Sequence, residues 1–62
     1  MRFVIDKARN GQYYWNCHAR NGEIIATSET YVSKVDAKHS INLIMSQAGA
    51  ADVVDLSAMS RY

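Results

Sequence analysis

The sequence predicts an α+β domain of element order βββαβ, in which one helix covers one face of an antiparallel sheet. Asn-Gly occurs at residues 10–11 and again at 21–22, each time after Ala-Arg and between runs of strand-forming residues. Asn-Gly favours tight hairpin turns because both residues tolerate a positive φ, so the two copies predict a three-stranded meander. A stretch with helical spacing follows, and the apolar run 51–56 predicts a fourth strand.

The first hairpin can close in two ways, and the choice decides which side chains share a face. A two-residue loop would place Ile5 opposite Asn16. A three-residue loop, with Gly11 in the left-handed conformation, would place Ile5 opposite Trp15. The second arrangement gathers the apolar side chains on one face, so we prefer the three-residue loop.

The same kind of loop in the second hairpin predicts that Cys17 pairs with Ile25 and Trp15 with Thr27. One face of the sheet then carries mainly apolar side chains: Phe3, Ile5, Tyr13, Trp15, Cys17 and Ile25. The reverse face is mixed and carries Val4, Asp6, Tyr14, Asn16, His18, Ile24 and Ala26.

Ser33 is the predicted N-cap of the helix, and Asp36 follows in the first turn, where a negative charge suits the helix dipole. The apolar stripe of the helix consists of Ala37, Ile41, Ile44 and Ala48, with Met45 at its edge. Gly49 is the predicted helix stop. We expect one domain over residues 1–56, followed by a loosely held tail at 57–62.

Composition narrows the class of protein. A chain of 62 residues buries only about 60% of the surface that its unfolded form exposes. The single cysteine excludes an intrachain disulfide, and one thiol with two histidines gives no zinc ligand set. Oligomerisation is therefore the expected source of further stability, and no cofactor is expected.

The net charge of +1 argues against a dedicated polyanion binder. With no signal-like segment and no apolar run of about 20 residues, a cytoplasmic protein is expected.

A further pattern runs from the second turn to the start of the helix. It has the spacing NG-x-x-I-x-x-SE-x-Y-x-SK and consists of Asn21-Gly22, Ile25, Ser28-Glu29, Tyr31 and Ser33-Lys34. This pattern resembles the signature of the YegP-like family of uncharacterised small bacterial proteins. Further matches are Phe3, Ile5, Gly11-Gln12-Tyr13, Trp15, Ala19, Ile41 and the acidic end of the last strand. The resemblance therefore covers about residues 3–56.

The resemblance implies a short antiparallel sheet packed on one helix, a unit that is often present as two tandem copies. Because this chain holds one copy, the resemblance also implies a homodimer in which two chains pair as tandem copies do. The sequence departs from the family at Cys17, where leucine is usual, and at His39-Ser40, where Asn-Gly is commoner and a change at the start of the helix is expected. The family has no established reaction, so the resemblance implies no catalytic residue.

The candidate chemical groups give no active site. Cys17 and His18 are neighbours on a strand, so their side chains point to opposite faces and cannot form a nucleophile–base pair. We interpret Cys17 as a small core residue and His18 as a surface or interface residue. His18 and His39 lack a third metal ligand. We therefore expect no enzyme and no metal site.

The favoured function is a homodimeric interaction module. Apolar residues on both faces of a small sheet are typical of an interface. The two copies would pair their edge strands or bury the reverse face through Val4, Tyr14, Ile24 and Ala26.

The alternative is weak binding of single-stranded nucleic acid through the open sheet face, where Tyr14 would stack on a base. The candidate contacts are Tyr14, His18, Arg2 and Arg20, with Arg9, Lys34 and Lys38 as further phosphate ligands. A deep pocket lined by Tyr14 and His18 would instead favour a small-molecule ligand.

Overall fold

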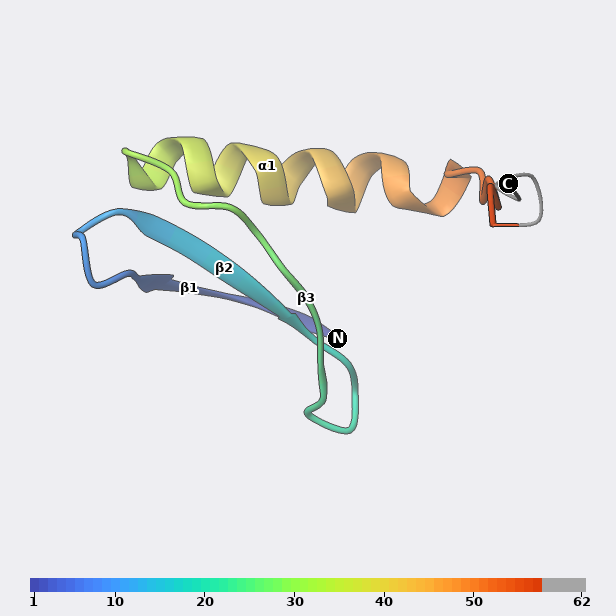
Figure 1. The fold of residues 1–62 in the computed structure, drawn as a ribbon, viewed down its shortest axis with the longest axis horizontal. Helices are drawn as coiled ribbons and strands as arrows, with labels where there is room; N and C mark the ends of the chain where they lie inside the picture. Colours follow the sequence, from blue (N-terminus) through green and yellow to red (C-terminus); the bar gives the residue numbers. More distant parts are fainter. Residues whose placement is uncertain (58–62) are drawn as a thin grey trace.

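A computed structural model describes residues 1–57, which form a three-stranded antiparallel sheet and one long helix. Strands β1 (Arg2–Lys7), β2 (Tyr13–His18) and β3 (Ile24–Thr27) lie in the order β1-β2-β3. Helix α1 (Lys34–Gln47) lies above the sheet and continues into the short 3-10 helix η1 (Ala48–Ala50) (Figure 1). The α+β class and the antiparallel meander are confirmed.

The first hairpin closes with the preferred three-residue loop. The amide of Ala8 donates to the carbonyl of Gln12 at 2.7 Å, and the amide of Gly11 donates to that of Ala8 at 2.9 Å. Gly11 has a φ of +87°, the left-handed conformation that this loop requires. Ile5 therefore lies opposite Trp15, as predicted.

The second hairpin has the same turn but a different register. His18 lies opposite Ile24, as a three-residue loop requires. A β-bulge follows, in which Ile25 is the extra residue, and Cys17 consequently pairs with Ala26. The predicted pairing of Cys17 with Ile25 is wrong, and Ala26 no longer belongs to the reverse face.

Polar side chains fix the register beyond the bulge. Thr27 lies opposite Asn16 rather than Trp15, and its hydroxyl donates to the Asn16 side-chain oxygen at 2.8 Å. The amide of Ser28 donates to the carbonyl of Trp15 at 2.9 Å, and its hydroxyl accepts from the amide of Trp15 at 2.9 Å. Ser28 thus provides both hydrogen bonds that the backbone of Trp15 needs at the end of β3.

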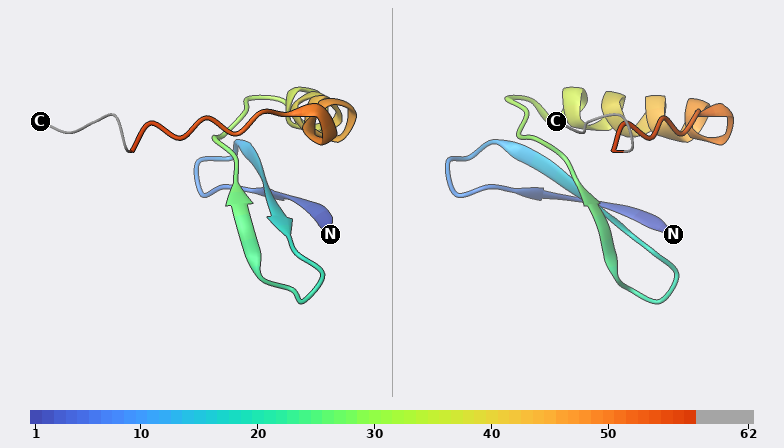
Figure 2. Two further views of the ribbon diagram at one scale, coloured as in Figure 1. Left: turned by 90° about the vertical axis from the view of Figure 1, so that its right-hand side faces the viewer. Right: turned by 45° about the vertical axis from the view of Figure 1, so that its right-hand side comes forward.

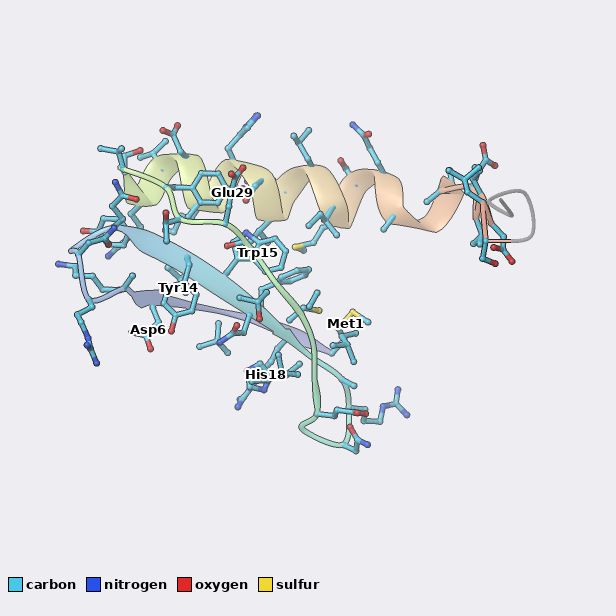
Figure 3. The ribbon with its side chains drawn as sticks, in the orientation of Figure 1. Met1, Asp6, Tyr14, Trp15, His18 and Glu29 are labelled. Carbon is cyan, nitrogen blue, oxygen red and sulfur yellow. The ribbon has the colours of Figure 1, made fainter. Side chains whose placement is uncertain are left out.

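The core lies between β2 and the first half of α1. Its buried side chains are Trp15, Cys17, Ala37 and Ile41. Half-buried side chains pack around them: Phe3, Ile5, Tyr13 and Tyr31. The ring of Phe3 meets that of Trp15 edge-on, with centroids 5.2 Å apart. Figure 3 shows Trp15 pointing toward α1 and Tyr14 pointing away from it, which confirms the predicted parity of the central strand.

The start of α1 is confirmed, whereas its predicted end is wrong. The hydroxyl of Ser33 accepts from the amide of Asp36 at 3.1 Å, as an N-cap does. Gly49 lies inside η1 and has no positive φ, so it is not a left-handed stop. The chain instead tightens into a 3-10 turn, in which the amide of Ala51 donates to the carbonyl of Ala48 at 3.1 Å.

The predicted fourth strand is absent from residues 51–57, which form no regular element and are exposed. Val53 and Leu56 expose 96% and 62% of their surface. Figure 2 shows this orange-red segment leaving the end of α1 and projecting clear of the sheet. Within residues 1–57 this segment has no neighbouring strand, so its backbone forms no ladder hydrogen bonds there. The rest of the predicted tail, residues 58–62, lies outside the described residues.

Candidate interaction surfaces

An apolar groove lies between β1 and the middle of α1. It has a volume of about 540 Å³. Its main lining residues are Phe3, Ile5, Ile41, Met45, Arg2 and Lys38. The groove borders β1, which pairs with β2 on one side only within the described sheet. An unpaired strand edge beside an apolar groove is suited to the addition of a further strand.

The reverse face of the sheet holds most of the residues that were predicted to share it. Val4, Tyr14 and Ile24 lie on this face through their cross-strand pairs. Ala26 does not, because the bulge shifts it by one residue and Thr27 takes the place on this face. Tyr14 is half-buried and Ile24 is 53% exposed, so the face is mixed. That it forms a dimer interface stays a prediction.

Three of the four main candidate contacts for nucleic acid meet at one end of the sheet. Arg2 pairs with His18 across β1 and β2, and Arg20 lies in the turn after β2. All three line a pocket of about 280 Å³. Tyr14 also points away from α1 but does not line this pocket (Figure 3). The structure therefore brings the three basic residues together and leaves Tyr14, the predicted stacking residue, outside their pocket.

The other predicted phosphate ligands are dispersed. The Lys34 ammonium lies 5.8 Å from the centroid of the Tyr13 ring, and that of Lys7 lies 5.3 Å from the same centroid. Lys38 lines the apolar groove, and Arg9 lies in the first turn, at the other end of β2. These cations do not form one surface with the pocket at the second turn.

The chemical groups considered for catalysis or metal binding are kept apart. Cys17 is buried on the helix side of β2, whereas His18 lies on the reverse face. His39 belongs to α1, which packs on the helix side. Within residues 1–57 no three His, Cys, Asp or Glu side chains are placed to hold a metal ion. In the same part of the chain, no helix has the length and apolar character needed to cross a membrane.

Ser40 has a role that sequence reasoning missed. His39 and Ser40 were expected to affect the start of the helix, but they lie in its second turn. The hydroxyl of Ser40 accepts from the indole nitrogen of Trp15 at 2.8 Å and donates to the carbonyl of Ala37 at 2.8 Å. No local pattern identifies this contact, because Trp15 and Ser40 are 25 residues apart in the chain.

The exposed segment after η1 carries negative charge. The Ser57 hydroxyl donates to the Asp55 carboxylate, and the Ser57 amide does so at 2.9 Å. These hydrogen bonds, the side-chain bond foremost, hold the pKa of Asp55 below its ordinary value of 3.8. Asp55 is therefore ionised at neutral pH. Asp52 lies in the same exposed segment.

Comparison with known proteins places this architecture in a family. A family model described as a domain of unknown function (DUF1508) matches residues 8–55. The UPF0339 protein YegP of Yersinia pestis is 48% identical over 46 residues, which are 74% of this chain and 41% of that protein. A UPF0339 protein of Neisseria meningitidis serogroup B is 39% identical over 56 residues, 90% of this chain and 100% of its own length. The chain thus spans less than half of the Yersinia relative and all of the Neisseria relative.

Two solved structures share the fold. The solution structure of a protein from Agrobacterium tumefaciens superposes with a TM-score of 0.79 at 37% identity, over 97% of each chain. That of a protein from Haloferax volcanii has a TM-score of 0.77 at 33% identity, over 87% of this chain and 92% of the other. The sequence signature, the family match and the shared fold agree: the chain belongs to the DUF1508 family of domains of unknown function, which includes the YegP-like UPF0339 proteins.

Proposed function

We propose that this chain is a non-enzymatic interaction module that acts as a homodimer, in which two copies exchange residues 51–56. The segment of each copy forms a fourth strand beside β1 of the other and covers the apolar groove. The expected cytoplasmic location belongs to the same proposal. One observation carries this proposal. A single chain leaves two complementary features uncovered: an exposed apolar segment with acidic residues, and an apolar groove with basic residues.

The core of a single copy is small. Four side chains are buried within residues 1–57, and one of them is an alanine. The second half of α1 and the segment after it expose large apolar side chains: Leu43, Ile44, Met45, Val53, Val54 and Leu56. A domain of this size has a small free energy of unfolding, because it buries a small share of its surface. A second copy that covers these side chains would supply the missing burial.

The exposed segment has the composition of a strand. Val53 and Val54 are β-branched, and Ala51 already has extended backbone angles, with φ −71° and ψ 143°. In a strand, Val54 and Leu56 point to the same side because side chains alternate. Each side then carries one aspartate, and Val54 and Leu56 would face the groove because together they are larger than Ala51 and Val53 on the other side.

Charge favours the same pairing. The groove is lined by Arg2 and Lys38, and the segment carries Asp52 and Asp55. In the strand arrangement Asp52 shares the groove side with Val54 and would lie near Lys38, which lines the groove but not the pocket at the second turn. Opposite charges at the rim of an interface fix its register and exclude other pairings.

Sedimentation equilibrium at micromolar concentration tests the homodimer. The test variant is Val54→Asp and the matched control is Val35→Asp, because the two valines are 75% and 74% exposed in the single chain. The wild type and Val35→Asp are expected to sediment as dimers. Val54→Asp is expected to sediment as a monomer, because its carboxylate would enter the groove of the partner. A monomeric wild type, or equal dissociation of both variants, would refute the proposal.

A second candidate function is weak binding of single-stranded nucleic acid through the reverse face. The pocket that gathers Arg2, His18 and Arg20 favours it, because phosphate contacts supply most of the affinity in non-specific binding. Titration with single-stranded DNA and RNA tests it at two salt concentrations. Binding is expected to weaken with added salt, and salt-insensitive or undetectable binding would exclude this function.

A further inference from the structure

The pocket at the second turn is lined by basic residues from three parts of the chain. Arg2 comes from the first position of β1, His18 from the last position of β2, and Arg20 from the turn that follows. The remaining lining residues are Met1, Ala19 and Gly22. Among the described residues no carboxylate is part of the lining, although acidic and basic residues are nearly balanced over the whole chain.

The two guanidinium groups in this pocket have no partner in the part of the chain that the structure describes. Within residues 1–57, neither Arg2 nor Arg20 forms an ion pair or a side-chain hydrogen bond. Each guanidinium offers five N–H donors in a planar fork, and the imidazole of His18 adds another donor. Both guanidinium groups are positively charged at neutral pH, so each would attract an anion that enters the pocket.

We propose that this pocket binds the phosphate group of a small phosphomonoester. Two guanidinium forks match the paired oxygens of a phosphate, and the charge-assisted hydrogen bonds that result are about twice as strong as neutral ones. The volume of about 280 Å³ lies just below the usual range of ligand pockets, about 300–1,000 Å³, and suits only a small ligand. Tyr14, the predicted stacking residue, lies outside the lining, so we favour a small ester over a nucleic-acid strand that would also stack on Tyr14.

The turn fixes the backbone position of Arg20. The amide of Gly22 donates to the carbonyl of Ala19 at 2.9 Å, and the amide of Glu23 donates to the side chain of Asn21 at 3.0 Å. Gly22 has a φ of +90°. The backbone that carries Arg20 is thus closed by hydrogen bonds on both sides, which reduces the entropy lost when an anion binds.

The first turn supplies a matched control within the same chain. Arg9 occupies the same Ala-Arg-Asn-Gly frame as Arg20. Its turn has the same hydrogen bonds, with the amide of Gly11 donating to Ala8 at 2.9 Å and that of Gln12 to Asn10 at 3.0 Å. Arg9 and Arg20 are both exposed, but Arg9 lies at the other end of β2, away from the pocket at the second turn. The two arginines differ in their neighbours and not in their turns.

The experiment follows amide chemical shifts of the labelled full chain during titration with inorganic phosphate and with phenyl phosphate, at constant ionic strength. We expect saturable shifts at Arg2, His18 and residues 19–22. Arg20→Gln is expected to weaken binding about tenfold or more, since it removes a charge-assisted pair. Arg9→Gln is expected to leave the affinity unchanged, and Arg20→Lys, which keeps the charge without the fork, to be intermediate.

Equal weakening by Arg9→Gln and Arg20→Gln would overturn the proposal, because it would indicate attraction to net charge alone. A single-stranded oligonucleotide without a terminal phosphate is titrated as well. If it binds more tightly than phenyl phosphate and changes the amide shift of Tyr14, the proposal is overturned in favour of nucleic acid. The titration is repeated with Val54→Asp. That variant tests the homodimer and lies outside the pocket, so phosphate binding is expected to persist when the dimer dissociates, and either proposal can fail alone.

Discussion

The indole nitrogen of Trp15 donates a hydrogen bond of 2.8 Å to the hydroxyl of Ser40, which joins the central strand to the second turn of α1. The same hydroxyl donates to the carbonyl of Ala37, so its oxygen is oriented to accept from the indole. Trp15 is only 6% exposed, and water cannot easily replace Ser40 as its partner. This bond therefore sets where the helix lies on the sheet.

Replacing Ser40 with alanine is expected to lower the free energy of unfolding by about 1–3 kcal/mol, because it leaves the buried indole N–H without an acceptor. Urea unfolding followed by the fluorescence of Trp15, the single tryptophan, measures the loss. Ser46→Ala is the matched control. The Ser46 hydroxyl also donates to a carbonyl three residues earlier, that of Leu43, but it is exposed and holds no tryptophan. Equal losses in the two variants would contradict this role of Ser40.

Replacing Gly22 with alanine is expected to cost about 1–2 kcal/mol, because its φ of +90° is unfavourable for a residue with a Cβ. Gly49→Ala is expected to be neutral or slightly stabilising, since Gly49 has no positive φ. An added Cβ would meet no atom within 4 Å at either position, so the comparison isolates the backbone. Thermal unfolding of both variants measures it. A comparable loss in Gly49→Ala would contradict the backbone explanation.

Replacing Ser33 with alanine is expected to cost about 1 kcal/mol, because the amide of Asp36 loses its capping acceptor. Ser33→Asp keeps an oxygen at the same place and is expected to retain most of the stability. Circular dichroism during thermal unfolding compares the two variants. If the alanine and aspartate variants unfold together, the cap does not stabilise α1.

Replacing Ser57 with alanine is expected to raise the pKa of Asp55 toward 3.8, because the side-chain hydrogen bond from Ser57 is the main cause of its lowering. These hydrogen bonds favour the ionised carboxylate, so they persist above the lowered pKa and weaken as the pH falls through it. Asp55 is fully exposed, and the effect therefore concerns the local turn. Carboxyl carbon shifts during an acid titration report the pKa. An unchanged value in the variant would show that another group lowers it.

The first hairpin was predictable from the sequence, whereas the second was only partly so. Ile5 and Trp15 stand in runs where one register clearly separates apolar from polar side chains, and that register is observed. Ile24, Ile25 and Ala26 are apolar in succession, so alternation does not identify the bulge. The register there depends on Ser28 reaching the backbone of Trp15, which is a long-range contact.

The helix shows the same division between local and long-range causes. Its N-cap is local and was predicted from Ser33 and Asp36. The apolar stripe was recognised, but the single sheet buries Ala37 and Ile41 and leaves Ile44 37% exposed. Packing between elements that are distant in the sequence creates the groove beside β1 and brings the basic residues together at the second turn. The spacing of residues along the sequence does not reveal either feature.

Isotope-filtered nuclear Overhauser spectroscopy on a mixture of labelled and unlabelled chains tests the exchange of residues 51–56 most directly. The homodimer predicts contacts between the methyl groups of Val54 in one chain and the side chains of Phe3 and Ile41 in the other. A mixture in which Val54 shows no contact across chains, at concentrations where sedimentation finds a dimer, would contradict the exchange.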